Sequence, residues 1–391
     1  MTSIVKLWIL VSASLVALFV SILFSITLGP LSVSMTDAWQ VVAFKLGLSS
    51  SPEGVTLLEQ NAIWELRMPR ALLAAVAGAA LAICGAVLQS LLRNGLADPY
   101  LLGISSGASA GAVVVVLTAS TAASFVMASG AFAGALAAFS LVLLLAWAAG
   151  NGNHNIILAG VAITQLFSAL TSFLIMFSAD ANTTRGVLFW MLGSSASSSW
   201  QTVVLSAAIF AVSFVVLFCH STALDAFTFG ADSAASLGIN VKRVRMVVIG
   251  VASLLAATIV SSSGAIGFVG LVLPHAARLI VGTGHRRVLP VSAALGAILL
   301  VWVDALGRTV AAPVETPVGV ITALVGVPLF IGSVGQAGEG ESYSCLTIMM
   351  QLLSGLRTRI GRCHSLFPTC ARAFLQLITC RSRPVQVTRS E

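Results

Sequence analysis

Charged residues are scarce in this 391-residue chain: Asp, Glu, Lys and Arg together make up 8% of it, whereas 58% of the residues are hydrophobic. Soluble domains carry about a quarter charged residues, so this composition does not suit a soluble globular fold. Long apolar runs take the place of the missing charge, and a membrane-spanning helix needs roughly 20 such residues. The sequence therefore predicts an all-α, polytopic membrane protein.

Motifs that carry chemistry are also missing from the sequence. No G-x-x-x-x-G-K-[ST] phosphate loop occurs, so the chain lacks that device for binding ATP. No cysteine pair has the C-x2-C spacing of a metal site, and Cys84 and Cys219 lie in or at the end of apolar runs, as buried thiols do. We also find no catalytic Ser/His/Asp arrangement and no cluster of His and Cys ligands. We expect no catalytic residue, no metal and no cofactor in this chain.

Ten apolar segments are candidate membrane spans. They cover residues 4–28, 68–92, 99–118, 123–149, 155–178, 200–219, 244–262, 266–283, 289–307 and 316–333. The first lacks an A-x-A cleavage site and is interpreted as an uncleaved helix rather than a signal peptide. Spans two to five and spans seven to ten start from opposite sides of the membrane, which permits an inverted repeat of two four-helix units.

Lysine and arginine predict the orientation, because cytoplasmic loops of membrane proteins are enriched in both. With the N-terminus inside, most of them fall on the cytoplasmic side. The opposite face then holds only Lys45, Arg67, Arg70, Arg185 and Arg308. An even number of spans places both termini in the cytoplasm, and we expect the protein in the inner (plasma) membrane.

Small residues recur at every fourth position in the hairpin over residues 67–111. They are Ala74, Gly78, Ala82 and Ala86 in the first helix and Gly103, Gly107 and Gly111 in the second. Residues four apart share one helix face. Because lipid tails are as apolar as leucine, helices in a membrane associate through close backbone approach, which small residues allow. We expect these glycines to lie at helix contacts.

Few ionisable residues lie more than two residues inside the predicted spans: only Asp304, His275 and Arg278 qualify. Such residues mark ion or proton paths in many transporters. Asp304 and Arg308 are four residues apart near the outer end of the ninth span, a spacing that favours a structural ion pair over a proton relay. Arg278 is expected to extend toward the cytoplasm. A purely ion-driven carrier therefore lacks its usual acidic groups.

One cytoplasmic loop before the tail, residues 220–243, is long in a chain whose other connections are mostly short. It has room for a short helix over 231–237 that ends at Gly238, since glycine commonly terminates helices. Two interpretations remain: a solvated connector, or a docking surface for a cytoplasmic partner.

Several long motifs, in order and at compatible spacing over residues 1–333, resemble the FecCD family of ABC-importer permeases. They include RMPR (67–70), GAVLQSLLRNGLADPYLLGISSGA (85–108), GFVGLVLPHAARL (267–279), HRRVLP (285–290) and ETPVGVITALVGVPLFI (315–331). This resemblance implies a ten-helix permease that pairs with a second copy or a close homologue. It further implies two ATPase subunits inside, which use the ATP, and a substrate-binding protein outside.

The resemblance also implies roles for particular residues. Docking of the binding protein would involve Arg67, Arg70 and Arg308, although charge alone equally suits solvated anchors. Coupling to the ATPase would involve Ala234, Ala235, Ser236, Leu237 and Gly238. The cytoplasmic gate would contain Asn153 and His154, where the vitamin B12 importer of this family has small hydroxyl residues.

The function that we expect is a permease for an iron chelate, with a ferric siderophore favoured, working by alternating access. Haem or vitamin B12 is the alternative cargo. Two other classes compete: a secondary transporter that works without an ATPase, and a membrane-embedded enzyme or structural subunit, for which the chain offers no nucleophile or metal site.

The tail, residues 334–391, departs from the family and is predicted to be separate from the permease domain at 1–333. It carries seven Arg, three Glu and no Lys. One interpretation is a basic amphipathic segment on the inner leaflet. The other is an extension without a selected function.

Overall fold

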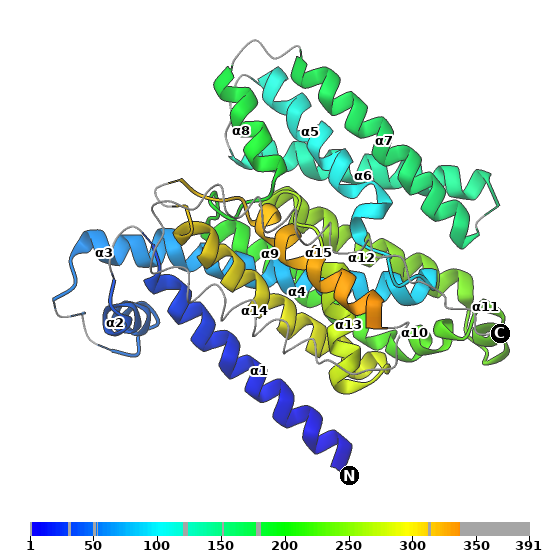
Figure 1. Ribbon diagram of the computed structural model, residues 1–391, viewed down its shortest axis with the longest axis horizontal. Coiled ribbons are helices and arrows are strands. Elements are labelled where there is room, and N and C mark those ends of the chain that lie inside the picture. The colour runs from blue at the N-terminus through cyan, green and yellow to red at the C-terminus, as the bar shows by residue number, and fades with distance from the viewer. Residues whose placement is uncertain are drawn as a thin grey trace, which may run out of the picture. The chain divides into compact units, whose positions relative to one another are not determined.

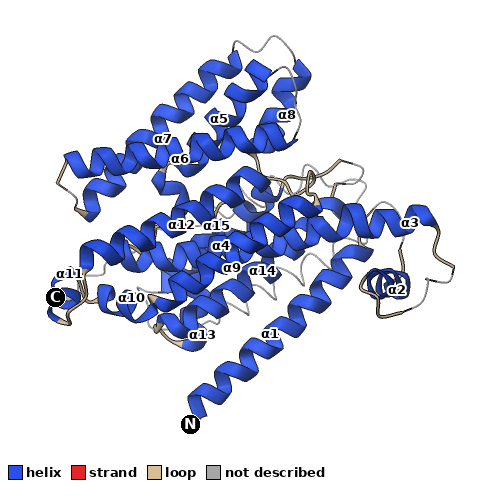
Figure 2. Ribbon diagram, turned by 180° about the vertical axis from the view of Figure 1, so that it is seen from behind, coloured by secondary structure: helices blue, strands red, loops and turns tan. Residues whose placement is uncertain are grey.

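The protein is helical in the computed structural model, which describes residues 2–29, 33–49, 52, 54–119, 124–150, 152–176, 181–311 and 314–336. These described residues form helices and loops and contain no strand (Figure 2). The chain divides into two compact units, residues 1–330 and 331–391. The predicted tail from residue 337 onward lies outside the described residues.

Each of the ten predicted spans corresponds to a helix. These helices are α1 (Thr2–Thr27), α4 (Met68–Leu92), α5 (Ile104–Ala119), α6 (Ser124–Ala148), α7 (Asn153–Met176), α9 (Trp200–Cys219), α12 (Val241–Ser263), α13 (Val269–Val281), α14 (His285–Thr309) and α15 (Val318–Gln336). Shorter elements connect them: α2 (Met35–Lys45), α3 (Leu57–Asn61), the π-helical turn η1 (Ala62–Arg67), the 3₁₀ turn η2 (Pro99–Leu102), α8 (Ala181–Met191), α10 (Ser221–Thr228) and α11 (Ala231–Ser236). The predicted all-α membrane architecture is confirmed.

Seven of the described helices are long and apolar enough to cross a membrane, and α5, α13 and the apolar part of α15 are shorter. The third span was predicted from residue 99, but its first residues form η2, which Asp98 caps by accepting a hydrogen bond from the Tyr100 N–H at 2.9 Å. The eighth span was predicted over 266–283, but the positive φ values of Gly264 (70°) and Phe268 (67°) keep the preceding chain non-helical. The 13 residues of α13 extend only about 20 Å, less than the roughly 30 Å bilayer core.

Helix α4 is the most enclosed of the candidate spans, with 89% of its apolar window buried inside the protein. Two glycines bring its backbone against its neighbours. A Cβ atom on Gly78 would lie 2.0 Å from the carbonyl oxygen of Gly296 in α14, and one on Gly85 would lie 1.8 Å from that of Gly270 in α13. Only glycine permits such an approach, and Gly78 is therefore at a helix contact, as predicted.

Helices α5 to α8 form a second group, seen together in Figure 1. Gly107 and Gly111 of α5 face Gly134 and Gly130 of α6, and a Cβ on Gly107 or Gly111 would lie within 2.5 Å of α6 atoms. Gly103, with φ of 71°, ends η2 next to Ile163 of α7. The predicted packing role of these glycines agrees with their positions.

The two halves of the bundle contact each other reciprocally. Helix α4, the second predicted span, packs on α13 and α14, the eighth and ninth, while α12, the seventh, packs on α5 and α6, the third and fourth. The second helix of each half, α5 or α13, also begins several residues after the start of its predicted span. An inverted repeat would produce both features.

Candidate functional site

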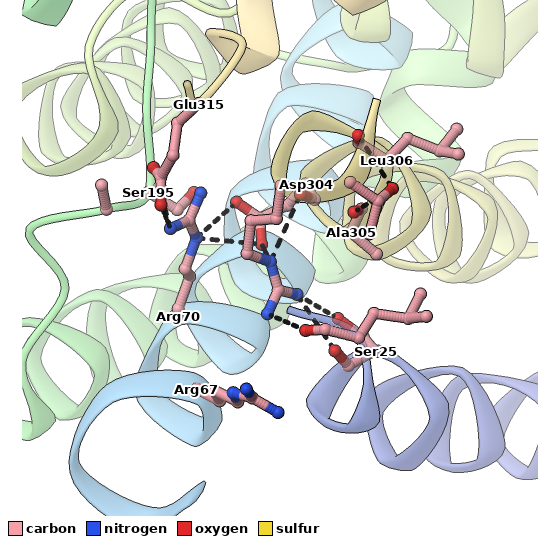
Figure 3. A network of polar contacts seen from close by, with 12 residues as sticks. Ser25, Arg67, Arg70, Ser195, Asp304, Ala305, Leu306 and Glu315 are labelled. Carbon is pink, nitrogen blue, oxygen red and sulfur yellow. Dashed lines mark hydrogen bonds and ion pairs between the residues drawn. The ribbon is translucent and has the colours of Figure 1, made fainter. Parts of the chain in front are cut away.

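A cluster of opposite charges joins α4, α14 and the segment before α15 (Figure 3). Arg70, in the first turn of α4, donates from Nε to both carboxylate oxygens of Asp304 at 2.9 and 3.1 Å. Its Nη1 donates to both oxygens of Glu315 at 2.9 and 3.1 Å. Such charge-assisted contacts are stronger and more directional than neutral hydrogen bonds. Arg70 therefore fixes the start of α4 to the end of α14.

Two more arginines of this cluster bind the C-terminal end of α1. Arg308 donates from Nη2 to the hydroxyl of Ser25 at 2.7 Å and from Nη1 to the carbonyl of Leu28 at 3.2 Å, while Arg67 Nη1 donates to the carbonyl of Ile26 at 2.7 Å. The last carbonyls of a helix lack intrahelical partners and carry a partial negative charge, which cations stabilise. The two guanidinium groups thus cap α1.

The arginine cluster, consisting of Arg67, Arg70, Arg308, Asp304 and Glu315, is buried apart from Glu315. The three arginines are 7 to 8% exposed and Asp304 is 0% exposed, whereas the Glu315 side chain is 41% exposed. The interpretation of these arginines as solvated anchors is therefore wrong, because intrachain acceptors enclose them. The predicted ion pair of Asp304 with Arg308 is confirmed, with Nε and Oδ2 3.2 Å apart.

Sequence reasoning missed one member of this cluster, Glu315, and one residue that contacts it, Ser25. Glu315 belongs to the ETP motif and pairs with a residue 245 positions earlier. Ser25 is one of several serines in an apolar helix, and its role depends on Arg308, 283 positions away. The sequence offered one signal for these contacts: Asp304 and Glu315 are acidic residues in or next to the last two spans, and a buried charge requires a partner.

Residues 220–240, which we call the coupling segment, fold into α10 and α11. Glycines with positive φ flank α11: Gly230 at 116° and Gly238 at 80°. Of the five predicted coupling residues, Ala234 is buried, and Ala235, Ser236, Leu237 and Gly238 are exposed. The short helix predicted over 231–237 is present as Ala231–Ser236, but α10 precedes it and was not expected.

A second polar cluster attaches the coupling segment to α4 and α14. His285, the first residue of α14, donates its backbone N–H to Asp225 Oδ1 in α10 at 2.9 Å, and its Nδ1 lies 2.6 Å from the same oxygen. Its Nε2 lies 2.5 Å from the hydroxyl oxygen of Ser90 in the last turns of α4. A Ser/His/Asp arrangement, absent from the sequence pattern, is therefore present in space.

This arrangement is not built for nucleophilic catalysis. Ser90 is 5% exposed and His285 is 1% exposed, so a substrate carbonyl has no access to the hydroxyl. The Ser90 hydroxyl also lies 3.1 Å from the Ala86 carbonyl of its own helix. The contacts join three helices rather than form a reactive centre.

The predicted gate residues lie at the beginning of α7 instead of in a turn. Asn153 is its first residue, and its Nδ2 donates to the carbonyl of Leu92 at the end of α4 at 3.2 Å. Its Oδ1 accepts a hydrogen bond from Arg245 of α12. His154 is exposed. Asn153 therefore holds three helix ends together.

Arg278, which the sequence analysis placed toward the cytoplasmic half of the eighth span, contacts α4. Its Nη1 donates to Gln89 Oε1 in α4 at 2.6 Å, and the Gln89 amide donates to the carbonyl of Gly270 at 3.2 Å. These bonds satisfy the polar groups where α13 packs on α4.

Asp98 lies between α4 and η2. Burial raises the pKa of its carboxyl to about 6, and the hydrogen bond from the Tyr100 N–H opposes that shift.

The described residues contain no group of three or more His, Cys, Asp or Glu side chains placed to hold a metal ion. Within the same residues, Cys84 and Cys219 are free, the first buried and the second exposed.

Comparisons with known proteins assign the chain to a family. A family model described as the FecCD transport family matches residues 17–334. The cobalamin import system permease protein BtuC of Halobacterium salinarum is 41% identical over 279 residues, which cover 71% of this chain and 74% of that protein. The Fe(3+)-citrate import system permease protein YfmD of Bacillus subtilis is 36% identical over 275 residues, which cover 70% of this chain and 81% of that protein.

Among solved structures, an ABC transporter assigned to the metal-chelate type, in an inward-facing conformation, superimposes with a TM-score of 0.73 and 28% sequence identity. The alignment covers 83% of this chain and 98% of that chain. These matches extend over nearly all of the described bundle, and the resemblance stated from the motifs is confirmed. The chain is a multi-pass membrane permease of an ABC importer for metal chelates and belongs to the FecCD transport family.

Proposed function

We propose that this chain carries an iron chelate, with a ferric siderophore favoured, across the inner membrane by alternating access, powered by separate ATPase subunits. The observation that carries the proposal is the coupling segment: two short helices attached to the bundle that present apolar side chains to solvent. Phe229 is 77% exposed and Leu237 is 72% exposed. Figures 1 and 2 place α10 and α11 at the opposite end of α4 from α3.

The partner on this side is an ATPase subunit. Exposed apolar side chains on a short, attached helical unit are typical of a docking surface. The chain itself has no phosphate loop, so the energy for transport comes from that partner. When ATP closes the two ATPase subunits, the coupling segment moves with them and changes the packing of the spans.

A substrate-binding protein docks at the other end, near the arginine cluster. The cluster holds three arginines and two carboxylates, a formal charge of +1, and Glu315 is its exposed member. A carboxylate of the binding protein would replace Glu315 on Arg70, while Arg67 and Arg308 keep the local potential positive. Complementary charges of this kind orient a partner and raise its association rate.

The cargo passes unchanged between two permease copies, along a path lined by α7 and α15. Similarity to a metal-chelate transporter and to a ferric citrate permease supports an iron chelate. Haem and cobalamin remain the alternatives, and the cobalamin permease is at least as similar to this chain as the ferric citrate permease.

Uptake in cells that express this chain with its ATPase and binding protein tests the proposal. We expect accumulation of radioactive iron from a ferric siderophore, and loss of that accumulation when the phosphate-loop lysine of the ATPase is replaced. Ferric citrate, haemin and radioactive cobalamin are compared at equal concentration. Iron uptake that persists with the inactive ATPase would identify a secondary transporter, and uptake of cobalamin alone would reassign the cargo.

A further inference from the structure

We propose that Asp225, His285 and Ser90 form a clamp that carries movement of the coupling segment into α4 and α14, and that these three residues position the transport helices during each ATP cycle. The inference rests on the proposed function, since it requires an ATPase that moves the coupling segment. It assigns a role to two buried side chains, Ser90 and His285, and to the half-buried Asp225 that contacts them.

The first link joins α10 to α14. Asp225 Oδ1 accepts two hydrogen bonds from one residue, from the backbone N–H of His285 at 2.9 Å and from its ring at Nδ1 at 2.6 Å. A backbone donor at the start of a helix cannot move without the helix. Displacement of α10 therefore acts directly on the beginning of α14.

The second link joins the same imidazole to α4. A neutral ring with its proton on Nδ1 donates to Asp225 and accepts at Nε2 from the Ser90 hydroxyl, 2.5 Å away. His285 is 1% exposed and Ser90 is 5% exposed, so water does not readily replace the bond between them, whereas the Asp225 side chain at the other end is 40% exposed. The imidazole ring of His285 thereby links the coupling segment to α4, which is distant from it in sequence.

Helices α4 and α14 are themselves joined along their whole length. They run antiparallel, with Arg70 bound to Asp304 at one end, Gly78 against Gly296 in the middle and Ser90 bound to His285 at the other end. Closely packed helices linked at both ends respond as one body, because packed interiors deform little. A push on α10 is thus transmitted to the arginine cluster at the far end.

The clamp connects the coupling segment to α4 and α14, which are not adjacent to it in sequence. The coupling segment follows α9 and precedes α12 in sequence, so those two helices are pulled by covalent connection. Helices α4 and α14 have no covalent connection to the coupling segment. Asp225 of α10 connects the segment to α14 through His285, and His285 connects it to α4 through Ser90. Side chains Leu224 and Phe227 of α10 are buried and support the contact.

The test uses the complete transporter in lipid vesicles. The binding protein and a ferric siderophore are supplied on the side of the membrane where the binding protein docks, and ATP hydrolysis and iron uptake are measured together. Asp225→Ala is expected to lower uptake per hydrolysed ATP about fivefold or more, the range of coupling factors between sites. Asp225→Asn, whose amide oxygen can still accept both bonds, should restore much of that ratio.

Thr118→Ala is the matched control, because this exposed threonine lies in α5, outside the coupling segment, and its hydroxyl donates to the Val114 carbonyl of the same helix at 2.9 Å. It should leave uptake per ATP unchanged. Ser90→Ala removes one oxygen from the other end of the clamp and should lower the ratio in the same direction. Should Asp225→Ala fail to assemble, Ser90→Ala decides the outcome.

Non-additivity identifies the three residues as one unit. The Ser90→Ala, Asp225→Ala double variant should lower uptake per ATP no further than the stronger single variant. An unchanged ratio in both single variants, or effects that multiply in the double variant, would overturn the clamp. A wild-type transporter without ATP-dependent uptake would instead contradict the proposed function.

Discussion

Asp304 is the residue on which the arginine cluster depends. Its carboxylate, 0% exposed, receives Arg70 at 2.9 Å and Arg308 at 3.2 Å, and so neutralises charge from two helices. A buried carboxylate of this kind is retained only when its partners are close, because desolvation of an unpaired charge is costly. The ninth span carries it at a position that a purely apolar helix would fill with Leu or Val.

Replacement of Asp304 by Asn should lower the free energy of unfolding by about 3–5 kcal/mol, the usual cost of breaking a buried ion pair. Arg308 then faces Arg70 without a charge between them. Thermal unfolding in detergent measures the effect, with Asp232→Asn on the exposed surface of α11 as the control. Equal unfolding temperatures for the two variants would show that the cluster contributes little to stability.

At the scale of helices, close backbone approach adds to side-chain burial as a source of packing. Gly78 of α4 and Gly296 of α14 each lie where a Cβ would meet the other's carbonyl oxygen, at 2.0 and 2.2 Å. Dispersion contacts and close backbone approach, rather than hydrophobicity, stabilise helix pairs in lipid. The α4–α14 pair is therefore sensitive to the addition of a single methyl group.

Gly78→Ala should destabilise the protein by about 1–3 kcal/mol, because overpacking forces the two helices apart. Gly250→Ala is the matched control: this glycine also lies inside a helix, α12, but a Cβ there meets nothing within 4 Å. The control should be neutral or stabilising by about 0.5–1 kcal/mol, since Ala is the better helix former. Thermal unfolding of both variants distinguishes the two outcomes; a tolerated Gly78→Ala would contradict the close contact.

For the whole molecule, the distribution of Lys and Arg predicts which side of the membrane each end of the bundle faces. The coupling segment is followed by Lys242, Arg243 and Arg245, as a cytoplasmic loop should be. The short segment over residues 46–49 would then face outward, and both termini inward.

Single cysteines in a cysteine-free background test this orientation. Leu48→Cys, at a 72% exposed position, should react with a membrane-impermeant thiol reagent added to intact cells, whereas Asp232→Cys should react only after permeabilisation. The physical reason is that positively charged loops are retained inside during insertion. The reverse labelling pattern would invert the assignment of the docking and coupling ends.

The sequence by itself determined the membrane class, the positions of ten helices, the small-residue faces and the family. These features depend on local composition, on helical periodicity and on motifs read along the chain. Helix length was less well predicted: α13 is shorter than its apolar run because positive φ angles at Gly264 and Phe268 are backbone choices that hydropathy does not register.

Only the tertiary structure decided which polar groups meet. Arg70 and Asp304 are 234 residues apart, and Ser90 and His285 are 195 apart, so no spacing rule links them. Burial reverses the expectation drawn from charge alone: arginines that a topology diagram places in water are enclosed by carboxylates and by the end of α1. A charge in a low-dielectric interior persists only with a partner at contact distance, and that partner is chosen by the fold.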